Sequence, residues 1–333
     1  MNLTSLLDSF DKLHVLVIGD LMLDRYVFGQ VSRISPEAPV PVVEWGREEN
    51  RLGGAANVAL NTLALGATTY LCGMVGKDTE STVFFDLLKK NGLTDHLVCT
   101  ASDRPTTVKT RIMAGGQHLL RMDKESVEDL TEKDELDLLR KIATLLDSKR
   151  LDVIILQDYN KGVLSESVII KLIQLADRKG VPVAVDPKAK NFWAFKRAAL
   201  FKPNLKEVKD ALPFKVEMET SALKKATRYI SEKTESQLVL LTLSESGLAM
   251  RNEDGFFHFP TKKRKVADVC GAGDGVIAVA SLALALNLGL AEIALLSNLV
   301  GGQIVEKQGV VPVDKEQLRA SLAYGLAAFS PQS

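Results

Sequence analysis

The stretch DVCGAGDGVIA, residues 268–278, joins a glycine-rich turn to an apolar segment of helical character. Gly271 and Gly273 allow dihedrals that other residues avoid, and they let the backbone approach a ligand closely. The amides of this turn, including that of Ala272, and the N-terminus of the helix would form an anion site. Asp274, at the start of the helix, would then suit a base that takes a proton from a hydroxyl while the amides hold a phosphoryl group. The alternative is that Asp274 only caps the helix.

Other nucleotide-binding motifs do not explain these glycines. A P-loop needs the pattern GxxxxGK[ST], but Gly76 and Lys77 are followed by Asp78 and lack the earlier glycine. The sequence GAGDGV differs from the dinucleotide fingerprint GxGxxG because Val276 takes the place of its last glycine. The turn therefore predicts neither a P-loop enzyme nor a dinucleotide-binding enzyme.

Outward from this turn, apolar strand-like runs alternate with amphipathic helical runs, which predicts an α/β fold with a doubly wound sheet. Expected strands cover 14–19, 68–76, 151–159, 181–187 and 238–244, and expected helices cover 56–67, 81–92, 131–147, 166–180 and a segment from about 274. Two stretches, 25–46 and 104–123, break this rhythm with strand-like patterns, the second around Gly115 and Gly116. We expect both to form antiparallel strands of a small lid. The pattern favours a single domain over residues 1–333.

The composition narrows the class of protein. The 333 residues include 42 Lys and Arg and 42 Asp and Glu, so the formal net charge is zero, which argues against nucleic acid or an anionic membrane as partner. Three cysteines and four histidines show neither disulfide nor zinc-site spacing, which indicates a reducing compartment and a cytoplasmic location. The nearly uncharged run 275–291 is slightly short of the ~18 residues that indicate a membrane span, so we expect a buried core helix without membrane insertion.

Four motifs resemble those of the ribokinase-like (PfkB) carbohydrate kinases and follow one another in that family's order. They are GGAANVA (53–59), PNLKE (203–207), TLSESG (242–247) and DVCGAGD (268–274). Together with the strand pattern, the resemblance covers nearly the whole chain. It implies an ATP-dependent carbohydrate kinase with an alcohol group as acceptor. The implied fold is ribokinase-like, a doubly wound and mostly parallel sheet flanked by helices, with a small β-strand lid.

A narrower resemblance lies in the stretch GDLMLDRYVFGQVSRISPEAPVPVV (19–43), which is similar to the opening of the bacterial D-glycero-β-D-manno-heptose 7-phosphate kinases. PTTVKTR (105–111), QDYNKGVL (157–164) and VDPK (185–188) also resemble that group. The resemblance implies phosphorylation of the sugar's anomeric hydroxyl to the 1,7-bisphosphate, in ADP-heptose and lipopolysaccharide core biosynthesis. In many bacteria this kinase is fused to a C-terminal nucleotidyltransferase with an HxGH-type motif. That motif does not occur here, so we expect no nucleotidyltransferase domain.

Two other functions stay open on the sequence alone. Fold does not decide the substrate, so a ribokinase-like kinase for another sugar or sugar phosphate is the first. A non-catalytic sensor of sugars or nucleotides that keeps the fold is the second. The presence of Asp274 and of both glycines of GAGD argues against this sensor.

The resemblance also implies roles for individual residues. Asp274 would be the general base, and the amides of Gly271, Ala272 and Gly273 would stabilise the transferring phosphoryl group. The substrate-binding candidates are Asp20, Asp24, Gly53, Gly54 and Asn57 for the sugar and Arg33, Lys109, Arg111, Lys161 and Lys188 for its phosphate. Gly53 and Gly54 would also form a hinge that lets the lid close and exclude water.

ATP and Mg²⁺ are the implied cofactors. The nucleotide-binding candidates are Asn204, Glu207, Thr242, Ser244, Gly247 and Asn298. Glu207 would act on magnesium largely through water, because Mg²⁺ keeps several waters and uses few carboxylates. Asp268 resembles part of the family's monovalent-cation loop, and the sequence leaves the use of potassium open.

Cys270 departs from the heptose kinase pattern, which usually has Thr at this position. Its place near a helix N-terminus predicts a thiol with a lowered pKa.

The partner implied by the resemblance is a small-molecule sugar phosphate. The apolar run VPVVEW (40–45) in the expected lid also predicts a homodimer through the lid.

Overall fold

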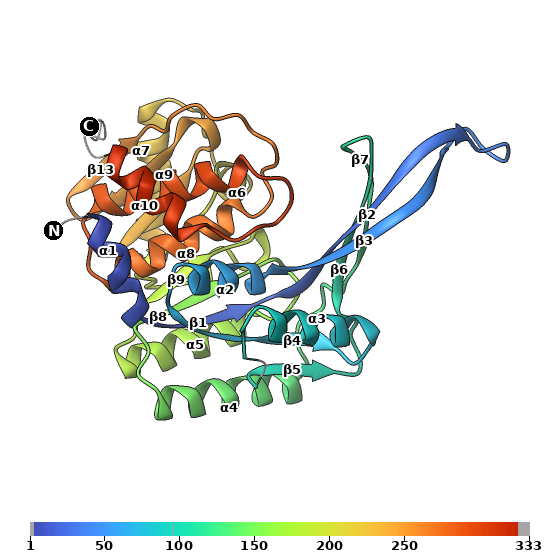
Figure 1. Ribbon diagram of the computed structural model, residues 1–333. Helices are drawn as coiled ribbons and strands as arrows, with labels where there is room; N and C mark the ends of the chain where they lie inside the picture. The colour runs from blue at the N-terminus through green and yellow to red at the C-terminus, as the bar shows by residue number, and fades with distance from the viewer. Residues whose placement is uncertain (1–2, 95, 326–333) are drawn as a thin grey trace.

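The computed structural model describes residues 3–94 and 96–325 (Figure 1). Its main sheet has the order β13-β12-β11-β10-β9-β8-β1-β4-β5. These strands are β1 (His14–Gly19), β4 (Thr68–Gly76), β5 (Val98–Ala101), β8 (Val153–Gln157), β9 (Val183–Asp186), β10 (Leu200–Phe201), β11 (Leu238–Thr242), β12 (Leu248–Asn252) and β13 (Gly255–Phe259). Neighbours from β5 to β11 pair in parallel, and β12 pairs antiparallel with both β11 and β13. The prediction of a doubly wound, mostly parallel sheet is confirmed.

Helices cover both faces of this sheet, and β1 shows how the sequence divides them. Val15 and Val17 point into one apolar core and Leu16 and Ile18 into the other, as the two-residue period of a strand requires. The first core takes in side chains of α1 (Leu3–Ser9), α2 (Ala55–Ala64), α3 (Thr79–Lys90), α8 (Ala272–Ala285), α9 (Leu290–Val305) and α10 (Lys315–Gly325). The second takes in α4 (Glu132–Ser148), α5 (Glu166–Lys179), α6 (Leu205–Ala211) and α7 (Thr220–Thr234). Short 3₁₀ turns cover Phe10–Lys12, Ala189–Asn191 and Ser244–Ser246.

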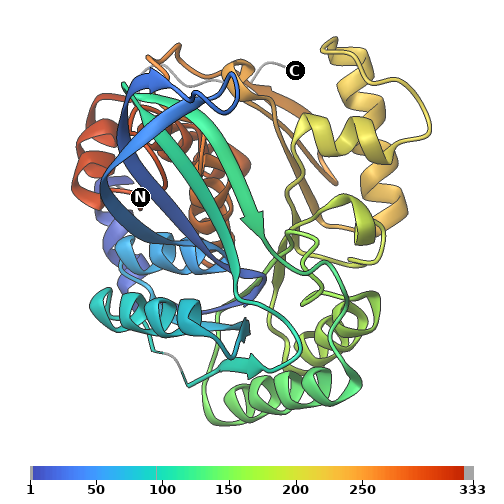
Figure 2. The same cartoon turned by 90° about the vertical axis from the view of Figure 1, so that its right-hand side faces the viewer.

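A second sheet of four strands projects from the body as a lid, and Figure 2 shows its strands side by side in front of the body. Its order is β3-β2-β6-β7, with β2 (Leu21–Ile34), β3 (Pro41–Gly54), β6 (Thr107–Ala114) and β7 (Gln117–Lys124). The first hairpin is longer than the expected 25–46, because its ladder continues until Leu21 pairs with Gly54 beside the body. Gly115 and Gly116 join β6 to β7 with φ of 57° and 79°, the left-handed values that a tight hairpin turn needs.

The apolar run 275–291 does not form one long helix. Helix α8 is buried from Asp274 to Ala283 and ends at Ala285, and α9 starts at Leu290. The prediction of a buried core helix is therefore confirmed for α8. A membrane crossing would need a helix longer and more continuously apolar than any in the described part of the chain.

The carboxyl ends of the parallel strands meet the base of the lid. Asp20 follows β1, Tyr159 follows β8, and Asp186 ends β9. Open α/β sheets bind ligands at this edge. The N-terminus of α8, with Asp274, comes to the same place.

Candidate active site

Asp274 lies in the first turn of α8 and is held from two sides. Gly271 precedes the helix with φ of 79°, a left-handed conformation that favours glycine. Nδ2 of Asn57, in α2, donates a hydrogen bond to Oδ2 of Asp274 at 2.7 Å. The hydroxyl of Tyr159 donates to Oδ1 at 2.7 Å. These two donors fix the plane of a buried carboxylate.

The ionisation of Asp274 suits proton transfer at neutral pH. Burial raises its pKa to about 6, while the hydrogen bonds from Asn57 and Tyr159 oppose that rise. The carboxylate is therefore ionised above about pH 6, yet it is a stronger base than an ordinary aspartate. A general base is most effective when its pKa lies near the working pH.

The glycine-rich turn beside Asp274 has a positive lining. First-turn amides of a helix lack intrahelical partners, which suits them to anion binding. In this turn the N–H of Ala272 makes a long bond, 3.4 Å, to the carbonyl oxygen of Val269. A methyl group added at Gly273 would lie 3.7 Å from Nζ of Lys202, which places this buried ammonium next to the turn. Nζ of Lys202 lies 3.0 Å from Oδ2 of Asp186, and the same oxygen accepts from Nε2 of Gln157 at 3.1 Å. The arrangement can hold a phosphoryl group beside a base.

Asp20 holds the loop that follows β8. Its Oδ2 accepts the backbone N–H of Tyr159 at 2.7 Å and of Lys161 at 3.0 Å, and its Oδ1 accepts that of Val163 at 3.1 Å. Sequence reasoning placed Asp20 among the sugar ligands. In the structure the carboxylate is turned to this backbone, and it acts on the site through the loop.

Asp24 and Arg111 form a buried ion pair between neighbouring lid strands, through Oδ1 and Nη1. A methyl group at Gly53 would lie 2.1 Å from Oδ2 of Asp24, so only glycine fits beside this carboxylate. Gly54 has φ of 60°, and a methyl group there would lie 2.3 Å from the carbonyl oxygen of Asp20. The di-glycine signature thus serves close packing at the base of the lid, while Asp24 largely neutralises Arg111.

Two of the predicted phosphate-binding lysines come together on one carboxylate. Nζ of Lys161 lies 2.7 Å from Oε1 of Glu125, and Nζ of Lys109 lies 3.2 Å from Oε2 of the same residue. Lys109 also pairs with Asp123 at 3.0 Å. Arg33 lies on the exposed outer part of β2 and does not join this cluster.

The Asn-x-x-Glu element forms a capping box at the start of α6. Oδ1 of Asn204 accepts the N–H of Glu207 at 2.9 Å, and Oε2 of Glu207 accepts the N–H of Asn204 at 2.8 Å. The other oxygen of Glu207 pairs with Nζ of Lys188. Although burial lowers it, the pKa of Lys188 is raised by the carboxylates of Asp186 and Glu207. The structure therefore brings Lys188 to the nucleotide-binding candidates.

The remaining nucleotide-binding candidates follow β11 or lie on α9. Thr242 ends β11, and Ser244 and Gly247 follow it with φ of 53° and 87°. A methyl group at Gly247 would lie 2.2 Å from the carbonyl oxygen of Phe259, so the turn packs tightly on β13. Nδ2 of Asn298 donates to that carbonyl at 3.4 Å, which puts it beside the same turn.

Asp268 bridges two loops, and the expectation for its neighbour Cys270 is wrong. Oδ1 of Asp268 accepts the N–H of Cys270 at 3.0 Å, and Oδ2 accepts that of Gly309 at 3.0 Å. Burial, helped by the Asp268 carboxylate, raises the pKa of Cys270 to about 11. The thiol precedes the helix and lies next to a negative charge, so it does not gain the lowered pKa predicted from its position.

Four residues at or beside the site were missed as candidates. Tyr159 and Asp186 lie inside stretches already singled out, QDYNKGVL and VDPK, and Lys202 directly precedes PNLKE. Glu125 follows β7 with no motif to mark it. Proximity to a recognised motif could have found the first three, because the ends of neighbouring parallel strands meet in space.

Solved structures share the fold of this chain. Phosphofructokinase-2 from Escherichia coli, in complex with potassium, has a TM-score of 0.76 at 18% identity and covers 94% of this chain and 98% of its own. Ribokinase from Arabidopsis thaliana, complexed with ribose and ATP, has a TM-score of 0.72 at 17% identity, covering 93% and 98%. The prediction of a ribokinase-like fold is confirmed.

Curated relatives are similar over nearly the whole chain. The "Bifunctional protein HldE" of Methylobacillus flagellatus is 40% identical over 313 residues, covering 94% of this chain and 64% of the relative. Its namesake in Helicobacter pylori is 39% identical over 306 residues, covering 91% and 65%. The chain thus spans a little less than two thirds of the length of these relatives.

A family description also matches the chain directly. The pfkB family carbohydrate kinase pattern covers residues 12–316, which includes both lid hairpins, Asp274 and the two residues that donate hydrogen bonds to it. The prediction of an ATP-dependent carbohydrate kinase, made from four short motifs, agrees with this match over most of the chain. The chain belongs to the pfkB family of carbohydrate kinases.

Proposed function

We propose that this protein transfers the γ-phosphoryl group of ATP to the anomeric hydroxyl of D-glycero-β-D-manno-heptose 7-phosphate, giving the 1,7-bisphosphate for ADP-heptose and lipopolysaccharide core synthesis. The observation that carries the reaction type is a buried carboxylate, Asp274, held by two donors beside the glycine-rich turn at the N-terminus of α8. The choice of sugar rests on the stretches that resemble heptose 7-phosphate kinases. Three of these stretches supply Asp20, Tyr159 and Asp186 to the site.

The chemistry divides between the base and the turn. Asp274 takes the proton of the anomeric hydroxyl while the hydroxyl oxygen attacks the γ-phosphorus of ATP. ADP is the leaving group. The amides of Gly271, Ala272 and Gly273 hold the equatorial oxygens of the phosphoryl group, where charge is greatest. Lys202, next to Gly273 of the turn, adds positive charge and remains paired with Asp186.

The phosphate of the substrate would bind between Lys109 and Lys161. Their ammonium groups face one carboxylate, Glu125, from two different segments, the lid and the loop after β8. A phosphate dianion can replace or join that carboxylate between the two cations. Asp24 and Asn57 would meet the sugar hydroxyls nearer to Asp274.

The nucleotide phosphates would lie between the α8 turn and the α6 capping box, near Asn204, Thr242, Ser244 and Gly247. A divalent cation fits this place, because Oδ1 of Asp186 is buried without a hydrogen-bond partner. Magnesium there would neutralise charge on the phosphates and would reach Glu207 largely through water.

No group of three or more His, Cys, Asp or Glu side chains among the described residues is arranged to hold a metal ion. A monovalent cation such as potassium would bind near Asp268, whose two oxygens already order the adjoining loops.

We also propose that residues 1–333 form a single kinase domain with a lid that closes over the site. We propose further that the protein works in the cytoplasm, where ATP is made, and that two copies form a dimer through their lids. Lid closure about Gly53 and Gly54 would exclude water from the transferring phosphoryl group. The adenine would approach Asn298.

A coupled ADP-release screen tests the choice of substrate. We expect turnover with the heptose 7-phosphate, and a KM far below those for ribose, fructose and fructose 6-phosphate. Each sugar is measured with and without potassium, and with ATP alone as the control for hydrolysis. Turnover confined to a different sugar would refute the heptose assignment while leaving the kinase assignment intact, and no ADP release with any sugar would speak for the sensor.

A further inference from the structure

The loop that follows β8 is shaped by a single carboxylate. Asp20 accepts three backbone N–H groups of this loop, from Tyr159, Lys161 and Val163, at 2.7 to 3.1 Å. Gly162, with φ of 84°, lets the loop fold against the segment at Glu128, where an added methyl group would meet the carbonyl oxygen. The position of Tyr159 is therefore set by a buried group on another strand.

The side chain of Tyr159 reaches from this loop to Asp274. Its hydroxyl lies 2.7 Å from Oδ1, on the opposite side of the carboxylate from Asn57. Nζ of Lys188 lies 5.4 Å from the centre of the Tyr159 ring, close enough for a cation–π contact. The orientation of the phenol is therefore restrained by three contacts: the backbone bonds of its loop to Asp20, the contact of its ring with Lys188 and the hydrogen bond of its hydroxyl to Asp274.

We propose that Tyr159 is a positioning residue for the base: its hydroxyl orients the Asp274 carboxylate and favours the ionised form, and Asp20 holds Tyr159 in place. The inference rests on the proposed role of Asp274 as the base. It gives Asp20, which the sequence places among sugar ligands, a structural part in catalysis. Tyr159 need not touch the sugar for this purpose.

The groups around Asp274 determine in which direction its pKa changes when the Tyr159 hydroxyl is removed. Asp186, at the end of β9, raises its pKa, and Lys202, after β10, lowers it. Lys188 also interacts with Asp274, and the neutral amide of Asn57 donates from α2. The hydrogen bond from Tyr159 lowers the pKa, so its loss leaves Asp274 harder to ionise.

Tyr159 can act only as a donor at physiological pH. Burial, followed by the charge of Asp274, raises its pKa well above that of a free tyrosine. Each carboxylate oxygen has two lone pairs, so Asp274 can accept from Tyr159 and Asn57 and still receive a sugar hydroxyl. The two donors can therefore stay in place during proton transfer.

The test compares the pH profiles of kcat and kcat/KM for the wild type, Tyr159→Phe and Tyr229→Phe. Tyr229, on α7, packs against the rings of Trp193 and Phe214 and serves as the matched control. At low pH the rate should fall as Asp274 becomes protonated, and we call this part of the profile the acidic limb. In Tyr159→Phe we expect the acidic limb to move up by about one pH unit. We also expect kcat above this limb to fall about tenfold, because one hydrogen bond to a charged group is lost. The affinity for ATP should stay unchanged. Above about pH 6 the thermal midpoint should fall slightly, because a higher pKa of the folded-state carboxylate lowers stability there.

The substrate's own phosphate also titrates at about pH 6, but that group is the same in every variant, so only the enzyme group can move the limb. Asp20→Asn, which removes a backbone anchor of the loop, should shift the limb in the same direction. An unmoved limb in a folded Tyr159→Phe, or in Asp20→Asn where the first variant does not fold, overturns the positioning role. A rise in KM for the sugar alone would also overturn it, because it would make Tyr159 a substrate ligand.

Asp274→Asn separates this inference from the proposed function. Loss of turnover in Asp274→Asn by a factor of about 10² to 10⁴, with unchanged ATP affinity, supports the base role. Near-normal turnover of that variant would refute the base itself. An unmoved limb in Tyr159→Phe beside an inactive Asp274→Asn would refute only the positioning role.

Discussion

At the scale of single residues, Asp24 and Arg111 show how contacts across the lid constrain function. The pair joins β2 to β6, with 5% and 8% of the two side chains exposed. The guanidinium also lies 5.2 Å from the ring centre of Tyr26. Arg111 was predicted to bind the substrate phosphate, but most of its charge is already matched by Asp24.

Arg111→Ala should therefore act first on stability. It leaves the Asp24 carboxylate buried without its partner, which typically costs about 3 to 5 kcal/mol. We expect a large fall in the midpoint of urea unfolding, followed by circular dichroism. The double variant Asp24→Asn/Arg111→Ala should regain much of this loss, because no uncompensated charge remains.

Arg121→Ala is the matched control for this prediction. Arg121 is the cross-strand neighbour of Arg111 on β7, and its ion pair with Asp123 leaves 55% of its side chain exposed. Exposed pairs contribute about 0 to 1 kcal/mol, so this variant should unfold almost like the wild type. Equal destabilisation by Arg121→Ala and Arg111→Ala would contradict the view that burial of the pair is decisive.

The sequence predicted Asp274 as the base but not its contacts. The GAGD motif was enough to predict Asp274, because its glycines and its carboxylate are adjacent in the sequence. The family resemblance indicated Asn57 as a further site residue. Tyr159 lies 115 positions away from Asp274, and the bond depends on how β8, α8 and Asp20 meet. The role of Lys202 could not be predicted for the same reason, because nothing in its apolar sequence neighbourhood indicates that it will lie next to the glycine-rich turn.

At the scale of elements, α6 joins structure to the nucleotide candidates. Its capping box satisfies two backbone donors at the start of a helix of only seven residues, so its formation depends on that cap. In the proposed function the same two side chains, Asn204 and Glu207, also lie near the nucleotide phosphates. If this proposal holds, one motif serves both as a helix cap and as part of the nucleotide site.

Asn204→Ala should lower stability by about 1 kcal/mol, the usual effect of losing an N-cap, and should also weaken ATP binding. Thr131→Ala is the matched control, because Thr131 caps α4 by accepting the N–H of Asp134. Both variants should lose similar stability in urea unfolding, but only Asn204→Ala should raise the Kd for ATP measured by calorimetry. Asn204→Asp, which keeps the cap, should restore the stability. Equal ATP affinity in both alanine variants would remove Asn204 from the nucleotide site.

Periodicity predicted the helices and the parallel strands well, because burial on one or two faces fixes the apolar pattern. The lid was harder to delimit from sequence. The hairpin of β2 and β3 extends to Leu21 and Gly54, where the ladder enters the core and the alternation ends. The thiol of Cys270 shows a related limit, because its burial, followed by the charge of Asp268, sets its pKa, and neither can be read from its place before a helix.

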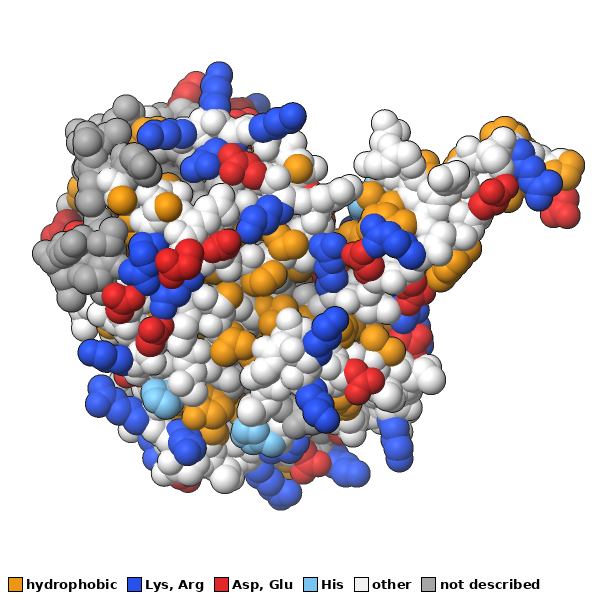
Figure 3. All heavy atoms as spheres, viewed as in Figure 1, with side chains coloured by type: hydrophobic (Ala, Val, Ile, Leu, Met, Phe, Trp, Pro, Cys, Tyr) orange, Lys and Arg blue, Asp and Glu red, His pale blue; other side chains and the backbone are white. Residues whose placement is uncertain are grey.

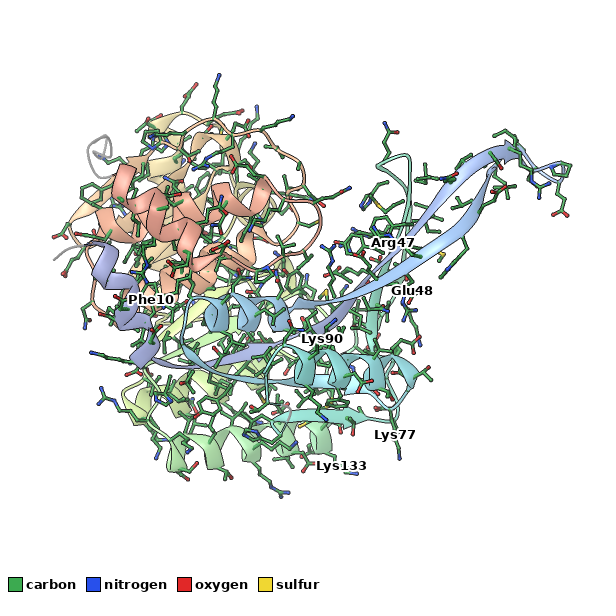
Figure 4. All side chains as sticks on the ribbon, viewed as in Figure 1. Phe10, Arg47, Glu48, Lys77, Lys90 and Lys133 are labelled. Atoms are coloured by element: carbon green, nitrogen blue, oxygen red, sulfur yellow. The ribbon has the colours of Figure 1, made fainter. Side chains whose placement is uncertain are left out.

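At the scale of the whole molecule, the lid leaves an apolar surface that the body does not cover. Figure 3 shows hydrophobic side chains along the projecting arm, and Figure 4 labels Arg47 and Glu48 on the part of β3 that lies within this arm. Ile34, Val40 and Trp45, in the outer part of the first hairpin, have relative exposures of 61%, 51% and 65%. On β7, Leu120 and Met122 are also more than half exposed. Several large exposed apolar side chains on one projecting sheet indicate an interaction surface.

We propose that a second copy of the chain covers this surface, because the two arms would then bury each other's apolar residues in a two-fold arrangement. We expect a dimer mass in light scattering at micromolar concentration, and a monomer for Trp45→Asp, because a stable interface of roughly 1,600 Å² cannot easily bury a new charge at its centre. Leu136→Asp, at a residue of α4 with 44% exposure, is the control and should remain a dimer. A wild-type monomer would contradict pairing through the lid, and a Trp45→Asp dimer would place the interface on another surface.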